Sequence, residues 1–225
     1  MKVSLYYLLT RLPALPNLGE VPPISWGEII PLVESTDDPG LRSLIEILRC
    51  ESDVEAIVRA RFEKRNDEAI PVQGLPGKLA EAVSADCPEQ NMADWHERVW
   101  NAWFDAVEEI GKVRRCRLLT NWAQWERSLR EELVIVRQNQ SPNSAPASSF
   151  VHQAAIDAWR GAANPLDAER ALDGARMAFL EEHGDRYGFS TEELIAYLLK
   201  LRLLQRYHRL DQTRARQLLR EVAGL

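Results

Sequence analysis

His96 and Glu97 are the adjacent residues that could begin a metal site, because helical zinc sites open with the pattern His-Glu-x-x-His. That pattern places a second histidine four residues after the first, so that both imidazoles face one metal ion. Position 100 is Trp100, so the second ligand is missing. The pair therefore predicts a helical segment rather than a zinc centre.

Other chemistry-bearing patterns are equally incomplete. His152, His183 and His208 share no ligand spacing with one another or with the cysteines, and we interpret the histidines as surface or helix-end residues. The chain has no GxGxxG after a strand, no GxxxxGK[ST] and no GxSxG. A carboxylate pair with shifted pKa values could form only through folding. We therefore predict no catalytic, cofactor-binding or metal-ligating residue, no cofactor, and a protein that is not an enzyme.

Tryptophan is abundant, with seven residues in the chain. Five of them crowd the centre: Trp95, Trp100, Trp103, Trp122 and Trp125. We favour a tryptophan-rich core between antiparallel helices. The alternative is an aromatic patch that faces a partner, since tryptophan is enriched in interface hot spots.

A basic cluster spans 112–117, with the sequence Lys-Val-Arg-Arg-Cys-Arg. We interpret it as an exposed face, and the functional alternative is an acidic protein partner. Nucleic acid is disfavoured because the chain carries a net charge of -6, whereas nucleic-acid binding needs a basic footprint. The apolar run 194–204 predicts a helix buried on several sides, or one that docks on another subunit.

The elements that would position these residues read as helices. Apolar residues at steps of three and four predict an amphipathic helix over 94–113: Val99, Trp103, Ala106, Ile110 and Val113. A second apolar series predicts a helix over 118–136. Only Gly111 and the basic cluster separate the two, which leaves either two antiparallel helices or one long bent helix.

Local signals predict where other helices begin. Ser25 with Glu28, and Ser190 with Glu193, have the spacing of capping boxes. The pairs Asp38-Pro39 and Asn164-Pro165 read as an N-cap followed by a proline at the first helical position. The expected helices occupy these ranges: 26 onward, 41–48, 53–64, 150–159, 165–183, 190–204 and, capped by Asp211, 211–222. The period of 4–9 does not decide between a strand and a helical turn.

The predicted fold class is all-α, as one multi-helix bundle or two sub-bundles joined by a polar linker. Residues 138–149 are polar and low in complexity, so they cannot bury enough apolar surface to order themselves. We therefore expect an N-terminal helical region at 1–137, a flexible linker or loop at 138–149 and a C-terminal helical region at 150–225. The two regions could also pack as one domain.

Composition fits an ordinary soluble protein. The chain has 225 residues, 45% hydrophobic and 28% charged, which suits a globular core. Three widely spaced cysteines predict a reduced, cytoplasmic protein without disulfides. Arg11 and Pro13 interrupt the short apolar N-terminus, so we expect no signal peptide. No apolar stretch approaches the length of a membrane span, so any membrane association is expected to be indirect.

Several landmarks together resemble a bacterial family whose genes accompany V/A-type ATPase operons. Its members are similar to the V-type ATPase subunit called C in prokaryotes and d in eukaryotes. The matching stretches keep the family's order: Tyr6-Tyr7-Leu8-Leu9, Leu12-Pro13, Pro22-Pro23-Ile24-Ser25, Trp122, Trp125-Glu126, Leu129-Arg130, Asn164-Pro165-Leu166, Arg170-Ala171-Leu172-Asp173, Tyr197-Leu198-Leu199-Lys200-Leu201, Arg206 and Leu210-Asp211. The chain departs from the family in the linker 138–149 and in the run 205–208.

The resemblance implies a non-catalytic coupling subunit in ATP-driven proton or sodium transport. Such a subunit sits on the cytoplasmic face of the membrane rotor ring, receives the central stalk and transmits torque. Its partners would be other ATPase subunits, and it would be cytoplasmic and peripheral to the inner membrane. The resemblance does not identify partner-binding residues, or separate a core rotor subunit from an accessory or assembly factor. The alternative is a helical adaptor or regulatory protein unrelated to the ATPase.

Overall fold

A computed structural model gives the fold of this chain. The structure describes residues 4–36, 38–63, 74–85, 91–138, 150–184 and 188–209. Most of the predicted linker, the predicted last helix from Asp211 and the third cysteine, Cys87, lie outside these described residues. Within the described ranges, the secondary structure consists of helices and loops without a β-strand, which confirms the all-α prediction.

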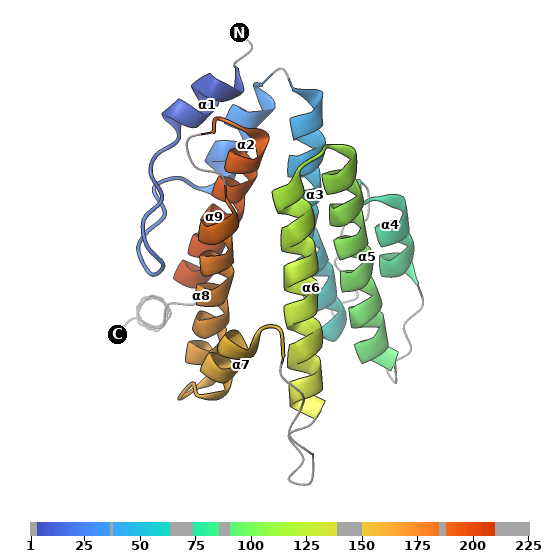
Figure 1. Ribbon diagram of the computed structural model, residues 1–225. Helices are drawn as coiled ribbons and strands as arrows, with labels where there is room; N and C mark the ends of the chain where they lie inside the picture. Colours follow the sequence, from blue (N-terminus) through green and yellow to red (C-terminus); the bar gives the residue numbers. More distant parts are fainter. Residues whose placement is uncertain are drawn as a thin grey trace, which may run out of the picture. The chain divides into compact units, whose positions relative to one another are not determined.

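Nine helices lie within these ranges (Figure 1). They are α1 (Leu5–Arg11), α2 (Trp26–Glu34), α3 (Pro39–Phe62), α4 (Gly77–Ser84), α5 (Met92–Val113), α6 (Arg117–Gln138), α7 (Gln153–Arg160), α8 (Pro165–His183) and α9 (Thr191–Arg209). Among the described helices, none combines the length with the low charge and high hydropathy that a bilayer crossing demands.

The chain groups into two compact units. Unit 1 combines Met1–Asp37 with Ser128–Leu225, and unit 2 is the continuous stretch Asp38–Arg127. This division differs from the predicted one at 138–149, because it falls inside α6 and assigns the N-terminal segment to the same unit as the C-terminal half. The polar composition of the predicted linker could not reveal which distant segments share a core.

Unit 2 contains one long helix where the sequence suggested two. The expected helices at 41–48 and 53–64 are wrong as separate elements, since α3 runs unbroken for 24 residues. Ser52 and Asp53 resemble a helix start, yet both lie exposed on the solvent side of a continuing helix. The buried positions Cys50 and Val54 continue the apolar stripe across this stretch at helical spacing.

Helix α5 lies against α3 in the opposite direction. The indole Nε1 of Trp103 donates a hydrogen bond to the carbonyl oxygen of Ile47 at 3.3 Å. Near the other end, the guanidinium of Arg61 lies over the ring of Trp95. The short helix α4 packs on α5 as well, through the buried side chains of Leu79 and Val83.

Helices α5 and α6 form an antiparallel pair, which resolves the alternative between two helices and one bent helix (Figure 1). The tryptophan-rich core is confirmed for four residues, because Trp95, Trp100, Trp103 and Trp122 are buried. Trp125 is half-buried and stacks on Trp122. The predicted stripe of α5 is wrong at its last residue, since Val113 is exposed at the end of the helix.

Unit 1 confirms the predicted helix starts. The Ser25 hydroxyl and the Glu28 carboxylate form the reciprocal capping box of α2, and the Asn164 side chain accepts the N–H of Asp167 at the start of α8. At α9, the Ser190 hydroxyl accepts the N–H of Glu193, and the Glu193 carboxylate accepts the N–H of Phe189. The undecided N-terminal stretch is helical, as α1.

A carboxylate from α6 caps the short helix α7. Glu132 is buried and accepts hydrogen bonds from the backbone N–H groups of Val151 at 2.9 Å and His152 at 3.0 Å. These groups precede α7, whose N-cap His152 makes no side-chain capping hydrogen bond. A negative charge at a helix N-terminus is favourable because it opposes the helix dipole.

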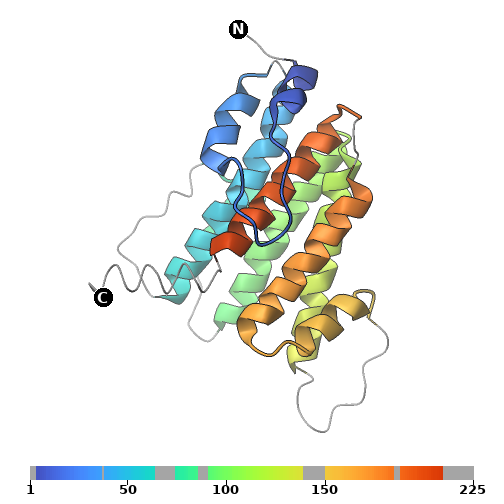
Figure 2. The same ribbon diagram turned by 90° about the vertical axis from the view of Figure 1, so that its left-hand side faces the viewer.

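The segment between α1 and α2 lies over α9 (Figure 2), and its residues line a cavity together with residues of α8. We call residues 12–18 of this segment the strap. Its prolines, Pro13 and Pro16, favour the extended backbone seen here and exclude a helix. The helix beneath it, α9, is buried almost all round, as the apolar run 194–204 predicted.

Candidate functional site

The strap is fixed to α9 by Tyr197. The phenolic hydroxyl of Tyr197 donates a hydrogen bond to the carbonyl oxygen of Pro13 at 2.9 Å. Burial raises the pKa of Tyr197 to about 12, so the phenol keeps its proton, and this hydrogen bond, at any physiological pH. Further along α9, the Gln205 amide donates to the carbonyl oxygen of Ile24, which joins the end of the same segment to the same helix.

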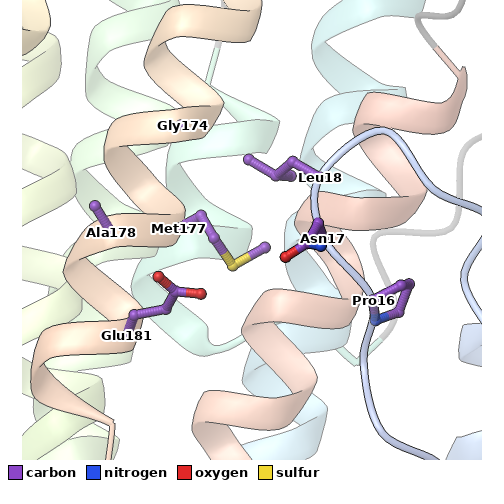
Figure 3. A pocket seen from close by; sticks show the side chains of 7 residues that line it. All are labelled: Pro16, Asn17, Leu18, Gly174, Met177, Ala178 and Glu181. Atoms are coloured by element: carbon purple, nitrogen blue, oxygen red, sulfur yellow. The ribbon is translucent and has the colours of Figure 1, made fainter.

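Two cavities lie beneath and beside the strap. The larger has a volume of about 450 Å³ and lies between Leu9–Leu15 and the helices α8 and α9. The smaller has a volume of about 230 Å³. Figure 3 shows the side chain of Met177 on α8 pointing toward Asn17 and Leu18 of the strap, with Glu181 one turn further along. The carboxylate of Glu181 lines both cavities.

The titratable groups of the larger cavity are Glu181, Glu193, Tyr197 and Lys200. The carboxylate of Glu193 already accepts the backbone N–H of Phe189. The buried carboxylate with a raised pKa, Asp173, lines neither cavity. Asp173, whose raised pKa would suit it to proton transfer, therefore does not face either cavity.

Asp173 belongs to a charged cluster that joins α8 to α9. One of its oxygens accepts hydrogen bonds from Arg176 at 2.9 Å and from Arg206 at 3.0 Å, and Arg206 also pairs with Glu169. Burial raises the pKa of Asp173, and the two arginines offset this only in part. The cluster fixes the position of α9 along α8, which is a structural role.

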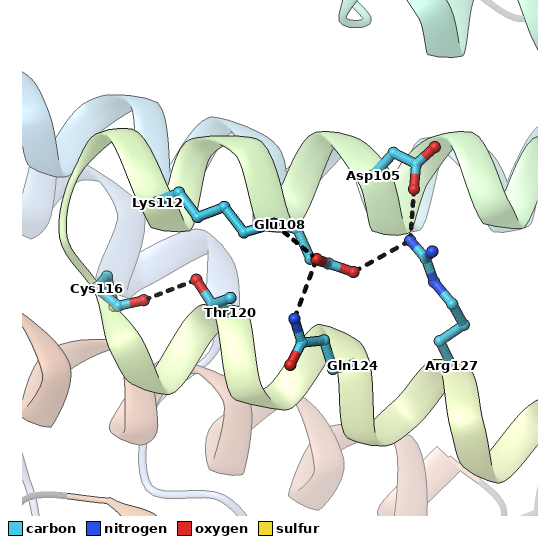
Figure 4. Close-up of polar contacts among 7 residues, drawn as sticks. All are labelled: Asp105, Glu108, Lys112, Cys116, Thr120, Gln124 and Arg127. Carbon is cyan, nitrogen blue, oxygen red and sulfur yellow. Dashed lines mark hydrogen bonds and ion pairs between the residues drawn. The ribbon is translucent and has the colours of Figure 1, made fainter.

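A second polar network ties α5 to α6 in unit 2 (Figure 4). Arg127 on α6 reaches Asp105 at 2.7 Å and Glu108 at 3.4 Å. Glu108 also accepts hydrogen bonds from Gln124 on α6 and from Lys112 on its own helix. Arg127 and Gln124 from α6 thus hold the two helices in register through Asp105 and Glu108 of α5.

The turn between these helices is very tight. Gly111 lies so close to α6 that a Cβ added there would be 2.6 Å from the Oγ1 of Thr120. The backbone N–H of Cys116 bonds to the carbonyl oxygen of Gly111 at 2.8 Å, and that of Arg115 bonds to Lys112 at 3.2 Å. These two bonds define a Schellman motif.

Arg115 occupies the position of this motif that glycine usually takes. Its φ is 56°, in the left-handed region that costs a residue with a Cβ roughly 1–2 kcal/mol. The predicted exposed face at 112–117 is confirmed for all residues except Cys116, which is buried. Arg114 is held against α3 by a hydrogen bond to the hydroxyl of Ser43 at 3.0 Å.

The histidines considered for metal binding make separate contacts with different partners. The ring of His96 accepts a hydrogen bond from the indole of Trp100, the residue that replaces the second histidine of the zinc pattern. His183 ends α8, donates to the carbonyl oxygen of Phe179 and stacks on its ring. His152 is buried, but as the N-cap of α7 it is a helix-end residue, as the interpretation of the histidines allowed. Among the described residues, no three His, Cys, Asp or Glu side chains are grouped to hold a metal ion.

Sequence reasoning missed two features of these sites. The burial of Asp173 had no signal of its own, although Arg176 follows at the helical spacing of an ion pair. Arg115 lies inside the basic cluster, which we interpreted from its charges alone, so its left-handed backbone was not predicted. Both depend on contacts that form only in the folded chain.

The comparisons with known proteins give one family match. Residues 131–225, from the second half of α6 to the end of the chain, match the model of a family described as a protein of unknown function, DUF2764. No curated protein and no solved structure matches this chain. The match covers most of unit 1 and leaves unit 2 outside it.

Proposed function

We propose that this chain is a non-catalytic subunit associated with a bacterial V/A-type ATPase. Its role would be to couple the rotor or central stalk in ATP-driven ion transport. The proposal rests on the resemblance to the operon-associated family and on one observation about where the resembling stretches lie. It places the chain at the cytoplasmic face of the inner membrane through protein partners alone.

The observation is that resembling stretches far apart in the sequence contact one another within unit 1. Tyr197, from a late stretch, donates its hydroxyl proton to the carbonyl oxygen of Pro13, from an early one. Arg206 pairs with Asp173, which closes another of the resembling stretches. Resembling stretches from the beginning and the end of the chain therefore meet in one folded unit.

The architecture of unit 1 also suits a mechanical role. The apolar core of α9, from Leu194 to Leu204, is buried, and the end of α9 beyond it is tied to α8 by the pair of the buried Asp173 and the half-buried Arg206. Buried, well-packed helices deform little because protein interiors have low compressibility. A subunit that transmits torque needs such stiffness and needs no active site.

Co-purification tests the proposal directly. The full-length chain, tagged and expressed from its own gene locus, is expected to bring down the rotor and stalk subunits of the ATPase, whereas the tag alone does not. Deletion of the gene is expected to reduce ATP-driven ion uptake into membrane vesicles more than it reduces ATP hydrolysis. A tagged chain that recovers no ATPase subunit, encoded far from the ATPase operon, would contradict the proposal.

The alternative is a helical adaptor or regulatory protein unrelated to the ATPase. It predicts a different set of co-purified proteins and a gene outside the operon. In that case, deletion leaves both ion uptake and ATP hydrolysis unchanged. The two readings therefore differ in every measurement of this experiment.

A further inference from the structure

Unit 2 gathers cationic side chains at one end. Helix α5 ends there, while α3 and α6 begin there, as the hydrogen bond from Arg114 to Ser43 shows. We define the cationic turn by the exposed residues at this end: Arg42, Lys112, Arg114, Arg115 and Arg117. The N-terminus of α6 lies beside these side chains and adds positive potential, since a helix dipole is positive at its N-terminus, whereas the N-terminus of α3 is capped by the carboxylate of Asp38.

The cationic turn is small and has an acidic border. Lys112 pairs with Glu108 one turn back along α5, and Glu108 is only 14% exposed. Asp105, a further turn back, is exposed and pairs with Arg127. The positive surface is thus confined to the end of the helical pair. It contains one carboxylate, that of Asp38, which is bonded to the first N–H groups of α3, and the carboxylates of α5 begin within about 6 Å of helix length, at 1.5 Å per residue.

The backbone of Arg115 is an independent indication that the cationic turn is a binding site. Its backbone holds φ at 56° in a Schellman motif, where glycine carries no Cβ penalty. The side chain is exposed and gains nothing from burial that would offset this cost. Strained backbone of this kind is concentrated at functional sites.

We propose that the cationic turn binds a short acidic segment of another protein. Four of its five cations are arginines, whose planar guanidinium groups bind carboxylates in a bidentate manner. A segment a few residues long can contact the end of the helical pair without meeting the flanking carboxylates. The inference does not depend on the ATPase assignment.

The dimensions of the cationic turn disfavour the two other anionic partners. A nucleic-acid duplex is bound through a long run of phosphates, typically about 6–10 contacts, which five clustered cations bordered by acids do not provide. A bilayer presents a flat anionic surface that would approach Glu108 and Asp105 together with the cations. A narrow acidic peptide avoids both problems.

The test uses the full-length chain and a fluorescein-labelled Glu-rich peptide of about twelve residues, with a Gln-rich peptide of equal length as the control probe. We expect saturable binding of the Glu-rich peptide that weakens with salt, and none of the Gln-rich peptide. Arg115→Gly is expected to weaken binding about two- to fivefold, because one exposed ion pair is lost. Arg115→Lys keeps the charge and is expected to retain most of the affinity.

Stability measurements separate binding from folding. Arg115→Gly removes the backbone strain, so its thermal unfolding temperature is expected to rise while its affinity falls. The matched control is Arg98→Gln, which removes the same charge from an exposed position near the other end of α5 and is expected to bind like the wild type. A merely structural role for Arg115 would move stability and leave binding unchanged.

Three results would overturn the proposal. The first is no binding of the Glu-rich peptide. The second is equal weakening by Arg98→Gln and Arg115→Gly, which shows attraction by overall charge rather than by the cationic turn. The third is tighter binding of phosphatidylglycerol vesicles or duplex DNA than of the peptide, with the same dependence on Arg115, which assigns the turn to a lipid surface or a nucleic acid.

Discussion

Tyr197 and Pro13 are joined by a hydrogen bond of 2.9 Å although 184 residues separate them in the chain. The bond connects the strap to the helix that forms the buried centre of unit 1. The half-buried ring of Tyr197 lines the larger cavity, while its hydroxyl meets the backbone of the strap. One side chain therefore closes the N-terminal segment onto the C-terminal half.

Tyr197→Phe is expected to loosen the strap without unfolding the protein. The substitution keeps the ring and removes one hydrogen bond, which lowers the free energy of unfolding by about 0.5–1.5 kcal/mol. Hydrogen exchange should accelerate in residues 5–18 and remain unchanged in α5. The matched control is Tyr6→Phe, which alters an exposed tyrosine of α1 and should change neither quantity. Equal exchange in both variants would show that Tyr197 does not hold the strap.

Glu132→Gln is expected to destabilise α7. The carboxylate of Glu132 accepts two backbone N–H groups, and an amide presents its own N–H₂ to one of them. A buried donor that loses its acceptor lowers the free energy of unfolding by about 1–3 kcal/mol. Urea unfolding of the variant measures the loss. Glu131→Gln removes the same charge from the exposed neighbouring position and should stay within about 0.5 kcal/mol of the wild type.

Two glycine substitutions are expected to change stability in opposite directions. At Gly111 a new Cβ would meet the Oγ1 of Thr120 at 2.6 Å and its backbone nitrogen at 3.2 Å. The side chain could rotate away but the backbone could not, so Gly111→Ala should lower the free energy of unfolding by about 1–3 kcal/mol. At Gly174 a Cβ would meet nothing within 4 Å. Gly174→Ala should therefore raise it by about 0.4–1 kcal/mol.

Asp173 is expected to make stability depend on pH in a defined direction. Its pKa in the folded chain is raised above the ordinary value of 3.8, so the folded state retains a proton that the unfolded state has lost. The free energy of unfolding contributed by this group therefore falls as pH rises from 3.8 through the folded pKa, and is constant above it.

The comparison with Asp173→Asn isolates this effect, because the amide does not titrate. Chemical unfolding of both proteins at a series of pH values should show the wild type losing stability relative to the variant as pH increases through that window. A difference that is flat, or that grows in favour of the wild type with increasing pH, would contradict the raised pKa. Glu181→Gln, which alters an exposed carboxylate on the same helix, is the control.

The sequence predicted the helix starts well because capping is local. Ser25, Asp38 and Asn164 each bond to backbone N–H groups two or three residues away, so a short stretch contains the whole interaction. The tryptophan core followed from helical spacing for the same reason. The continuity of α3 was missed because Ser52 and Asp53 have the composition of a helix start, and only packing on both sides of them decides the outcome.

The sites were less predictable than the helices. Asp173 and Arg206 are 33 residues apart and lie on two helices, so the local sequence around either residue does not predict their pairing. The left-handed backbone of Arg115 accompanies the two hydrogen bonds that close the turn after α5, and apolar periodicity carries no signal for it. Because the sequence contains no familiar catalytic motif, we predicted no site residue. The matching family is described as of unknown function, so the match adds no activity to that prediction.

The division of the chain has a consequence for its synthesis on the ribosome. Unit 2 is continuous, from Asp38 to Arg127, so every segment it needs has emerged once α5 and the first part of α6 have left the exit tunnel. Unit 1 needs the first 37 residues together with everything after Ser128. Residues 1–37 must therefore wait, without the hydrogen bond to Pro13, until Tyr197 has been translated. Domains generally fold as units during synthesis, so unit 2 is expected to fold before residues 1–37 join unit 1.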